Sequence, residues 1–257
     1  MTIQNIAQNQ MSGAMMRVSS GNRINSAADD PAGLAIIENM TSQIRGLDQG
    51  TRNTADMQSL INTAEGGLST VSDQVNRIRE LSVQALNGIN TPAQRAMIQT
   101  EIDQLAQGIQ DAVGGVQFNT MNLLDGSVQN ANTASSPDGT GASVSINDMS
   151  SIAQAMADIA AQGDFDLNAI DRAAGQVTEE RANLGALHNR MDYTMSANSI
   201  SSMNLADARS RIADADIALE MMRVSQDRTL TELQILMQQQ AQNDVEDRTN
   251  RVLQTGL

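Results

Sequence analysis

Residues Met57 to Leu81 read MQSLINTAEGGLSTVSDQVNRIREL, and their apolar side chains repeat at alternating steps of four and three. This spacing places the apolar side chains on one face of an α-helix, the seam of a coiled coil. The seam consists of Met57, Ile61, Ala64, Leu68, Val71, Val75 and Ile78. The residues between them are mostly polar, so a helix of this length buries its seam only against partner helices. The sequence therefore points to a role in helix association.

The composition of the whole chain favours slender helix packing over a thick globular core. Only three of the 257 residues are aromatic, Phe118, Phe165 and Tyr193, whereas 16 are methionine. Large aromatic side chains carry much of an ordinary globular core, and flexible methionines suit contacts between helices. The sequence predicts an all-α fold: a long antiparallel coiled-coil-like bundle with paired N- and C-terminal helices and a small irregular or β excursion in the middle.

The charge of the chain excludes several classes of function. The net charge is −14, from 30 acidic and 16 basic residues, and every basic residue is arginine. Without a basic patch or stacking aromatics, we expect no nucleic-acid binding.

No apolar run approaches the roughly 20 residues that span a bilayer, so we expect no membrane insertion. The N-terminal segment lacks the pattern of a cleaved secretory signal, and the chain contains no cysteine.

Capping residues predict where the long helices begin and end. Asp30 followed by Pro31 predicts a helix start, and Asn87-Gly88 predicts its end. Thr91-Pro92-Ala93-Gln94 has the pattern of a capping box and predicts a second start. We expect residues 92–113 to fold back on residues 57–86 as an antiparallel pair. Gly66-Gly67 predicts a kink in the first helix, because paired glycines destabilise a helix interior.

The second half of the chain has a variable segment and then two more apolar stripes. Between residues 126 and 150, 14 of 25 residues are Gly, Ser, Thr or Asn. This composition predicts a mobile surface excursion, or a small hairpin around the alternating residues 142–146. A third helical stripe begins at Leu167, and a fourth runs from Leu205 through Met222 to Met237. The two ends of the chain, residues 1–29 and the last twenty, are polar and weakly amphipathic, which predicts folding only against a partner.

No pattern in the sequence predicts catalysis. His188 is the only histidine, there is no HExxH zinc pattern, and no glycine-rich phosphate loop is present. Asp214, Asp216 and the run Glu179-Glu180-Arg181 lie among arginines, where solvated or inter-subunit ion pairs are expected. We therefore expect no enzyme, no catalytic residue, no cofactor and no metal site.

Several long motifs resemble those of bacterial flagellin. On the N-terminal side they are Arg17-Val18-Ser19-Ser20-Gly21, the run from Arg23 to Ile36, Gln43 to Leu47, Thr63 to Gly66, Arg77 to Leu81 with Val83-Gln84, and Gln117-Phe118-Asn119. On the C-terminal side they are Arg181 to Ala186 with Asn189-Arg190, and Ala208 to Asp216. The resemblance covers about residues 17–125 and 167–225. The motifs occur in the family's order at both ends, with a variable middle between them.

The resemblance implies an extracellular subunit of the bacterial flagellar filament that is exported unfolded through the type III apparatus. It implies that residues 1–29 and 215–257 form an inner, tube-lining domain. Residues 30–125 and 165–214 would form the helical wall, and residues 126–164 a variable surface excursion. Large outer domains, which many family members insert in the middle, are absent between these ranges. The first arginine motif lies closer to residue 1 than in most members, and the tail carries Asp244, Glu246 and Asp247, so packing of the inner domain is expected to differ.

The resemblance also implies two kinds of site. Charged residues of the matched motifs would make assembly contacts: Arg17, Arg23, Asp29, Asp30, Arg45, Arg79, Glu80, Arg209, Arg211, Asp214 and Asp216. Some family members are detected by the animal innate-immune receptor TLR5 through the wall helices. The matching positions here are Arg77, with a forked donor, Leu81, expected to be an apolar knob, and Glu101, a carboxylate. The same residues could instead contact neighbouring subunits.

The implied partners are further copies of the chain, the flagellar export chaperone, the cap proteins and, in animals, TLR5. Two alternatives stay open at this point. A hook–filament junction protein shares the N-terminal motifs more loosely, and the strict Arg209-Ser210-Arg211-Ile212 ending favours the filament subunit instead. A cytosolic coiled-coil signalling module, resembling part of a chemoreceptor, would form folded monomers or dimers that never elongate.

Overall fold

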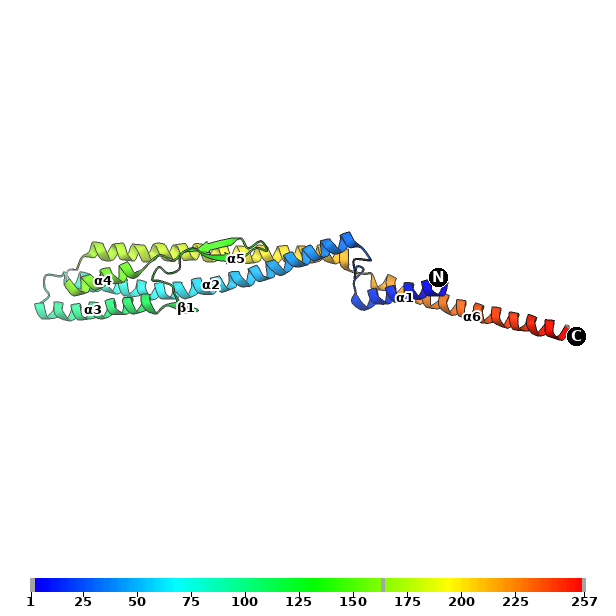
Figure 1. Cartoon of the computed structure of the whole chain (residues 1–257). Helices are drawn as coiled ribbons and strands as arrows, with labels where there is room; N and C mark the ends of the chain where they lie inside the picture. Colours follow the sequence, from blue (N-terminus) through cyan, green and yellow to red (C-terminus); the bar gives the residue numbers. More distant parts are fainter. Residues whose placement is uncertain (1–2, 163–164, 256–257) are drawn as a thin grey trace. The chain divides into compact units, whose positions relative to one another are not determined.

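The computed structural model describes residues 3–162 and 165–255, with side chains described for residues 11–161 and 165–250. The ends and the short gap of the ranges predicted above, residues 1–2, 163–164 and 256–257, lie outside the described residues. The helices are α1 (Ile3–Ser20), α2 (Pro31–Ala85), α3 (Pro92–Gly115), α4 (Ser150–Gln162), α5 (Leu167–Ala213) and α6 (Ile217–Thr255) (Figure 1). The strands are β1 (Gln117–Phe118), β2 (Met121–Asn122), β3 (Ala131–Ala134) and β4 (Gly141–Val144). The chain is mostly helical, as predicted.

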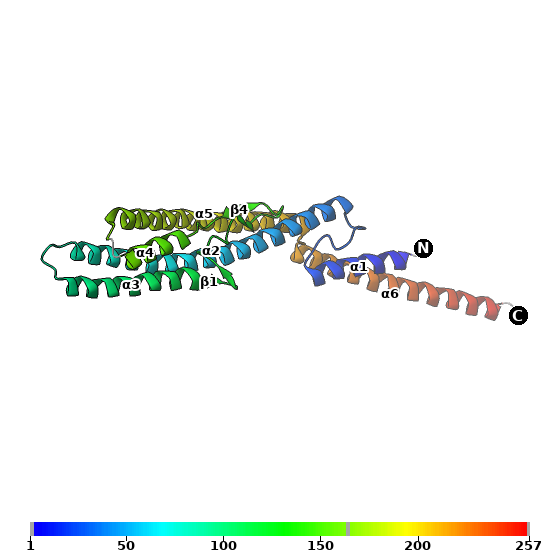
Figure 2. The ribbon, with the colours of Figure 1, turned by 60° about the vertical axis from the view of Figure 1, so that its left-hand side comes forward.

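The chain forms two compact units. Unit 1 consists of Met1–Ser42 and Asn204–Leu257, and unit 2 consists of Gln43–Met203. Within unit 2, α3 and α4 run beside the long helices α2 and α5, and both views show the four helices side by side (Figures 1 and 2). This arrangement confirms that residues 92–113 fold back on the first long helix.

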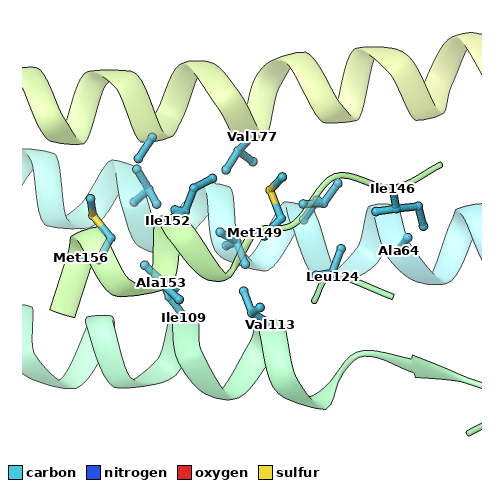
Figure 3. Packing of buried hydrophobic residues seen from close by; sticks show 14 of the residues in the cluster. Ala64, Ile109, Val113, Leu124, Ile146, Met149, Ile152, Ala153, Met156 and Val177 are labelled. Atoms are coloured by element: carbon cyan, nitrogen blue, oxygen red, sulfur yellow. The ribbon is translucent and has the colours of Figure 1, made fainter. Parts of the chain in front are cut away.

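The core of unit 2 is built from the heptad positions of the opening stretch. Ile61, Ala64, Leu68, Val71, Val75 and Ile78 all have no exposed surface. Ile109 and Val113 of α3, Ile152 and Met156 of α4, and Val177 of α5 pack in the same cluster (Figure 3). Each buried aliphatic side chain contributes on the order of 1.5–3 kcal/mol, so this seam is the main source of stability in unit 2.

The predicted helix starts are confirmed in atomic detail. The carboxylate of Asp30 accepts hydrogen bonds from the backbone N–H groups of Ala32 and Gly33, at 3.1 and 2.9 Å. Thr91 and Gln94 form a complete capping box at the start of α3, with Pro92 in the first helical position. These bonds satisfy N–H groups that a helix leaves without partners in its first turn.

The paired glycines Gly66-Gly67 do not interrupt helix α2. Helix α2 continues as regular α-helix through both residues. The reason is packing: a Cβ atom built at Gly67 would lie 2.6 Å from Val116 and 3.1 Å from Leu124, whereas nothing lies within 4 Å of one at Gly66. Gly67 therefore allows the chain after α3 to approach α2 closely, and this contact compensates for the low helix propensity of glycine.

Two short antiparallel hairpins follow α3, and the second of them lies in the variable middle segment. In the β1–β2 hairpin, Asn119 and Thr120 have φ angles of 48° and 66°, the left-handed conformation of a tight two-residue turn. In the β3–β4 hairpin, Ala131 pairs with Val144 and Ala134 with Gly141. Of the two alternatives for this segment, the structure shows the hairpin.

Side chains of the middle segment also enter the core of unit 2. Val144, Ile146 and Met156 have no exposed surface, and Ile152 is 1% exposed. Helix α4 follows the second hairpin and packs along α3 (Figure 1). The segment thus contributes more to the core than its Gly- and Ser-rich composition suggests.

Unit 1 brings the two ends of the chain together. Helix α1 packs against the first part of α6, which confirms the predicted pairing of the terminal helices (Figure 2). Both segments are helical in the single chain, where each serves as the partner of the other. The predicted continuous stripe from Leu205 to Met237 is wrong, because α5 ends at Ala213 and α6 begins at Ile217.

Candidate functional site

A buried carboxylate joins the two terminal helices. Arg17 of α1 lies 3.2 Å from Glu220 of α6, and Arg223 lies 2.8 Å from the other oxygen of the same carboxylate. The Glu220 side chain is 6% exposed, and its carboxylate forms an ion pair with each of the two arginines. Removing one partner from a buried ion pair is strongly destabilising, so this triad fixes the pairing of α1 with α6. The sequence motifs do not predict this role for Glu220.

The loop after α1 is bonded to the joint between α5 and α6. Asn22 forms an isolated antiparallel bridge with Asp214, and the Arg23 N–H donates to the Ala213 carbonyl at 2.6 Å. The Arg23 guanidinium donates to the Ile212 carbonyl at 2.8 Å, and the Ala215 N–H donates to the Gly21 carbonyl at 2.9 Å. These bonds use backbone groups freed by the break at residues 214–216, which explains why the helical stripe stops there.

Three of the acidic residues predicted to make assembly contacts accept hydrogen bonds from backbone N–H groups. Asp29 accepts from the N–H groups of Asn25 and Ser26, at 3.1 and 2.9 Å, and these bonds lower the pKa of its carboxyl, with the Asn25 bond contributing most. Asp30 caps α2, as described above. Asp216 accepts from the Leu219 N–H at 3.1 Å at the start of α6. These carboxylates have a local structural role in the single chain.

Two of the three residues predicted for receptor recognition, Arg77 and Glu101, lie on an exposed face of α2 and α3. The Arg77 guanidinium donates to the Glu101 carboxylate at 2.7 and 3.0 Å and to Glu80 at 3.1 Å. The side chains of Arg77 and Glu101 are 49% and 47% exposed. Both glutamates raise the pKa of Arg77 above its ordinary value, with the Glu101 hydrogen bond as the largest cause. The two helices therefore present a preformed charged pair to solvent.

Leu81 is not an exposed knob, which corrects the sequence expectation. Its side chain is 2% exposed and packs in the core cluster of unit 2. Leu81 lies three residues after Ile78 and beside Ser82, the next seam position, so it shares the buried face of α2 and turns towards the other helices. Only Arg77 and Glu101 of the three selected residues offer exposed surface.

Two polar bridges join α2 to α5. Arg79 donates to Asp171 at 2.6 Å, and this bond raises the pKa of Arg79. Gln58 donates to Asp192 at 2.7 Å and lies 3.0 Å from the ring nitrogen of His188. The only histidine is thus part of a helix-to-helix contact on a partly exposed face. Its partners belong to a structural bridge and form no catalytic constellation.

The other arginines predicted to make assembly contacts differ in their exposure. Arg45 on α2 and Arg211 on α5 are exposed. Arg209 is half-buried, and its Nε atom has no hydrogen-bond partner among the described residues. The structure thus brings Arg17, Arg23, Asp30, Asp214 and Asp216 into unit 1, whereas Arg77, Arg79 and Glu80 lie in unit 2.

Among residues 3–162 and 165–255, no group of three His, Cys, Asp or Glu side chains is placed to hold a metal ion. Helices long and apolar enough to cross a bilayer are also absent from this described part of the chain.

Comparison with known proteins agrees with this arrangement of terminal helices around a short middle. Residues 1–129 match the bacterial flagellin N-terminal helical region, and residues 167–247 match the bacterial flagellin C-terminal helical region. A flagellin of Halalkalibacterium halodurans is 41% identical over 240 residues, covering 91% of this chain and 88% of the relative. The flagellar filament 33 kDa core protein of Treponema phagedenis is 36% identical over 248 residues, covering 88% and 87%.

A solved structure shares the fold. It is the structure of a putative flagellar hook-associated protein from Vibrio parahaemolyticus, which aligns with a TM-score of 0.62 at 17% identity and covers 72% of this chain and all of that one. At this identity the match concerns the fold alone. The two family regions together cover most of the chain, and relatives above 35% identity extend over nearly its whole length. The chain therefore belongs to the bacterial flagellin family, the structural and non-enzymatic subunits of the extracellular flagellar filament.

Proposed function

We propose that the chain polymerises through α1 and α6, and that these helices form the inner layer of the filament. The observation that carries this proposal is the length mismatch between the two helices. Helix α1 has 18 residues and α6 has 39, so α1 can cover only part of α6. The rest of α6 exposes large apolar side chains, with Leu230 54%, Leu236 60%, Met237 69% and Val245 62% exposed.

Exposed large apolar side chains along one uncovered stretch of helix favour burial against further copies of the same chain. Contacts of a head-to-tail kind, in which different surfaces of two copies meet, produce an open helical polymer when the rotation does not close. We propose the division inferred from the family. Residues 1–29 and 215–257 line the tube, residues 30–125 and 165–214 form its wall, and residues 126–164 lie on the outside.

The proposed life cycle follows from the family. The chain is exported unfolded with a flagellar export chaperone and is added to the filament beneath cap proteins. The absence of cysteine from the chain suits this route, because no disulfide has to form or break during export.

Two deletions test the assembly proposal. A chain lacking residues 230–257, or one lacking residues 1–25, is mixed with short filament seeds beside the full chain. We expect long filaments by negative-stain electron microscopy from the full chain only. Circular dichroism of the deleted chains serves as the control, because the helices of unit 2 should remain folded. Filaments of normal length from either deletion would overturn the proposal.

We further propose that the α2–α3 face is recognised by the innate-immune receptor TLR5. The exposed Arg77–Glu101 pair supports this, because a forked guanidinium beside a carboxylate offers donors and acceptors in a fixed geometry. Leu81 lies beneath this face and would act by holding α2 in place. The same surface can serve contacts between subunits in the assembled filament.

Receptor recognition is tested with Arg77→Ala and Glu101→Ala in cells that report receptor activation. We expect each variant to lose about tenfold or more in potency, as residues central to a protein interface do. Asp103→Ala is the matched control, because Asp103 is an exposed carboxylate on the same helix as Glu101. Unchanged potency of both variants would refute recognition at this face. Substitution of Leu81 is not informative, since it disturbs the core.

A further inference from the structure

Unit 2 has a pocket lined partly by apolar and partly by polar side chains. Its volume is about 310 Å³, and it lies between α2, β1 and β3. Met57, Leu60 and Phe118 supply apolar surface, whereas Asp56 and Asn132 are exposed polar residues beside it. Thr133 also lines the pocket, and its buried hydroxyl has no hydrogen-bond partner among the described residues.

Among the side chains that the structure describes, the carboxylate of Asp56 forms no ion pair. Each of the described arginines that forms an ion pair does so with another acid, namely Glu220, Glu80, Glu101 or Asp171. The pocket therefore offers a negative charge beside an apolar surface. A side chain with an apolar stem and a cationic end matches both features.

The turn between α2 and α3 presents the features that the pocket would match, namely exposed apolar side chains and a positive charge. Leu86, Ile89 and Met97 are 55%, 84% and 74% exposed, which is unusual for neighbouring large apolar side chains. Arg95 lies among them in the first turn of α3 and is exposed. Figure 1 shows this turn at one end of the helices of unit 2, away from β1 at the pocket.

We propose that the α2–α3 turn of one copy docks at the Asp56 pocket of a second copy, with Arg95 placed against Asp56. The opposite charges of Arg95 and Asp56 favour a second copy of the chain as the partner. Each copy carries a net charge of −14, so two copies repel each other unless a specific contact brings opposite charges together. Arginine suits the contact because its methylene stem covers apolar surface while its guanidinium reaches the carboxylate.

The positions of the two surfaces make the contact head-to-tail. Asp56 and the end of α2 at Ala85 lie on one continuous helix, separated by about 45 Å at 1.5 Å per residue. The turn of a chain cannot reach the pocket of the same chain. Successive copies would be displaced by about 45 Å along α2, and the contact would repeat without closing. This inference rests on the proposed polymerisation and names a contact within the wall.

Disulfide trapping tests the contact, since the chain has no cysteine of its own. The variant with Ile89→Cys and Asn132→Cys is assembled on seeds and oxidised. Because the two positions are far apart in one chain, we expect a ladder of covalently linked multimers. The variant with Ile89→Cys and Thr70→Cys is the control, since Thr70 is exposed on α2 outside the pocket. Filaments that give no more ladder than this control would overturn the proposal.

Charge reversal tests the ion pair itself. Asp56→Arg and Arg95→Asp should each raise the critical concentration for seeded growth about fivefold or more, because each loses an ion pair, which alone is worth up to about fivefold, and also brings two like charges together. The double variant restores the pair in every contact and should return to within about twofold of the original chain. Asp73→Arg, an exposed position on α2 away from the pocket, controls for the change in net charge.

Two negative results separate the two proposals. If the original chain grows no filaments on seeds, polymerisation itself is refuted, and the docking contact with it. If the original chain grows and the double reversal remains as defective as the single ones, only the docking contact is refuted.

Discussion

Arg17 and Glu220 are separated by 203 positions in the sequence, and their side chains meet at 3.2 Å in unit 1. The Glu220 carboxylate is almost fully buried and is shared with Arg223. Because a buried carboxylate needs its cationic partners, this contact selects the pairing of the N-terminal helix with the first turn of α6. The two ends of the chain are thus held together before any further copy is added.

Loss of this contact should loosen the terminal pair. We expect Glu220→Gln to destabilise the α1–α6 pair by about 1–3 kcal/mol, because two charged donors lose their charged acceptor. Hydrogen exchange of the α1 amides measures this directly. Glu232→Gln, at an exposed position on the same helix, should leave the exchange unchanged. Equal exchange in the two variants would show that Glu220 does not hold the pair.

The adjacent glycines of α2 should respond in opposite ways to the same substitution. Gly67→Ala places a methyl group against Val116 and Leu124 and should destabilise the chain by about 1–3 kcal/mol. Gly66→Ala meets no atom within 4 Å and should stabilise it by about 0.5–1 kcal/mol through better helix propensity. Urea unfolding followed by circular dichroism measures both. A gain in stability for Gly67→Ala would contradict the close approach of Val116.

The β3–β4 hairpin is held by one amide from each long helix. Asn53 of α2 donates to the Ala134 carbonyl at 2.9 Å, and Asn198 of α5 donates to the Ser135 carbonyl at 2.8 Å. Asn198 is 8% exposed, so Asn198→Leu leaves a buried carbonyl without a donor and should cost about 1–3 kcal/mol. Asn183→Leu, exposed on the same helix, is the control in thermal unfolding. Equal unfolding temperatures for the two variants would contradict this role.

Acid should weaken the loop that precedes α2. The pKa of Asp29 is lowered in the folded chain, chiefly by the Asn25 N–H and then by the Ser26 N–H. A lowered folded pKa means that the stabilisation is present above the unfolded pKa, about 3.9, and is lost as the pH falls through the folded pKa. We expect exchange of the Asn25 and Ser26 amides to accelerate below about pH 4, beyond its intrinsic pH dependence, and Asp29→Asn to remove this effect. A pH-independent difference between the two chains would contradict it.

Local signals in the sequence were sufficient for the helix starts and the seam of unit 2. The Thr91 capping box and the Asp30-Pro31 start depend on residues a few positions apart, and the structure contains both. The heptad positions between Ile61 and Ile78 are fully buried for the same reason, since the periodicity alone defines the buried face.

Contacts between distant segments explain what the sequence did not predict. The helix break after Ala213 involves backbone bonds to residues 21–23, and the continuation of α2 through Gly67 accompanies its close contact with Val116. The Glu220 carboxylate and the pocket beside Asp56 each become visible only when separate elements meet. Leu81 was misplaced because the family resemblance indicated a role for it without indicating its burial.

The most direct test of the central claim is hydrogen exchange of α6 in the free chain and in sedimented filaments. In the free chain, the exposed residues Leu230, Leu236 and Val245 lie on a helix with little covering structure, so their amides should exchange rapidly. If α6 packs between copies in the filament, exchange across residues 230–250 should slow on the order of a hundredfold. Equal exchange in both states would contradict assembly through this helix.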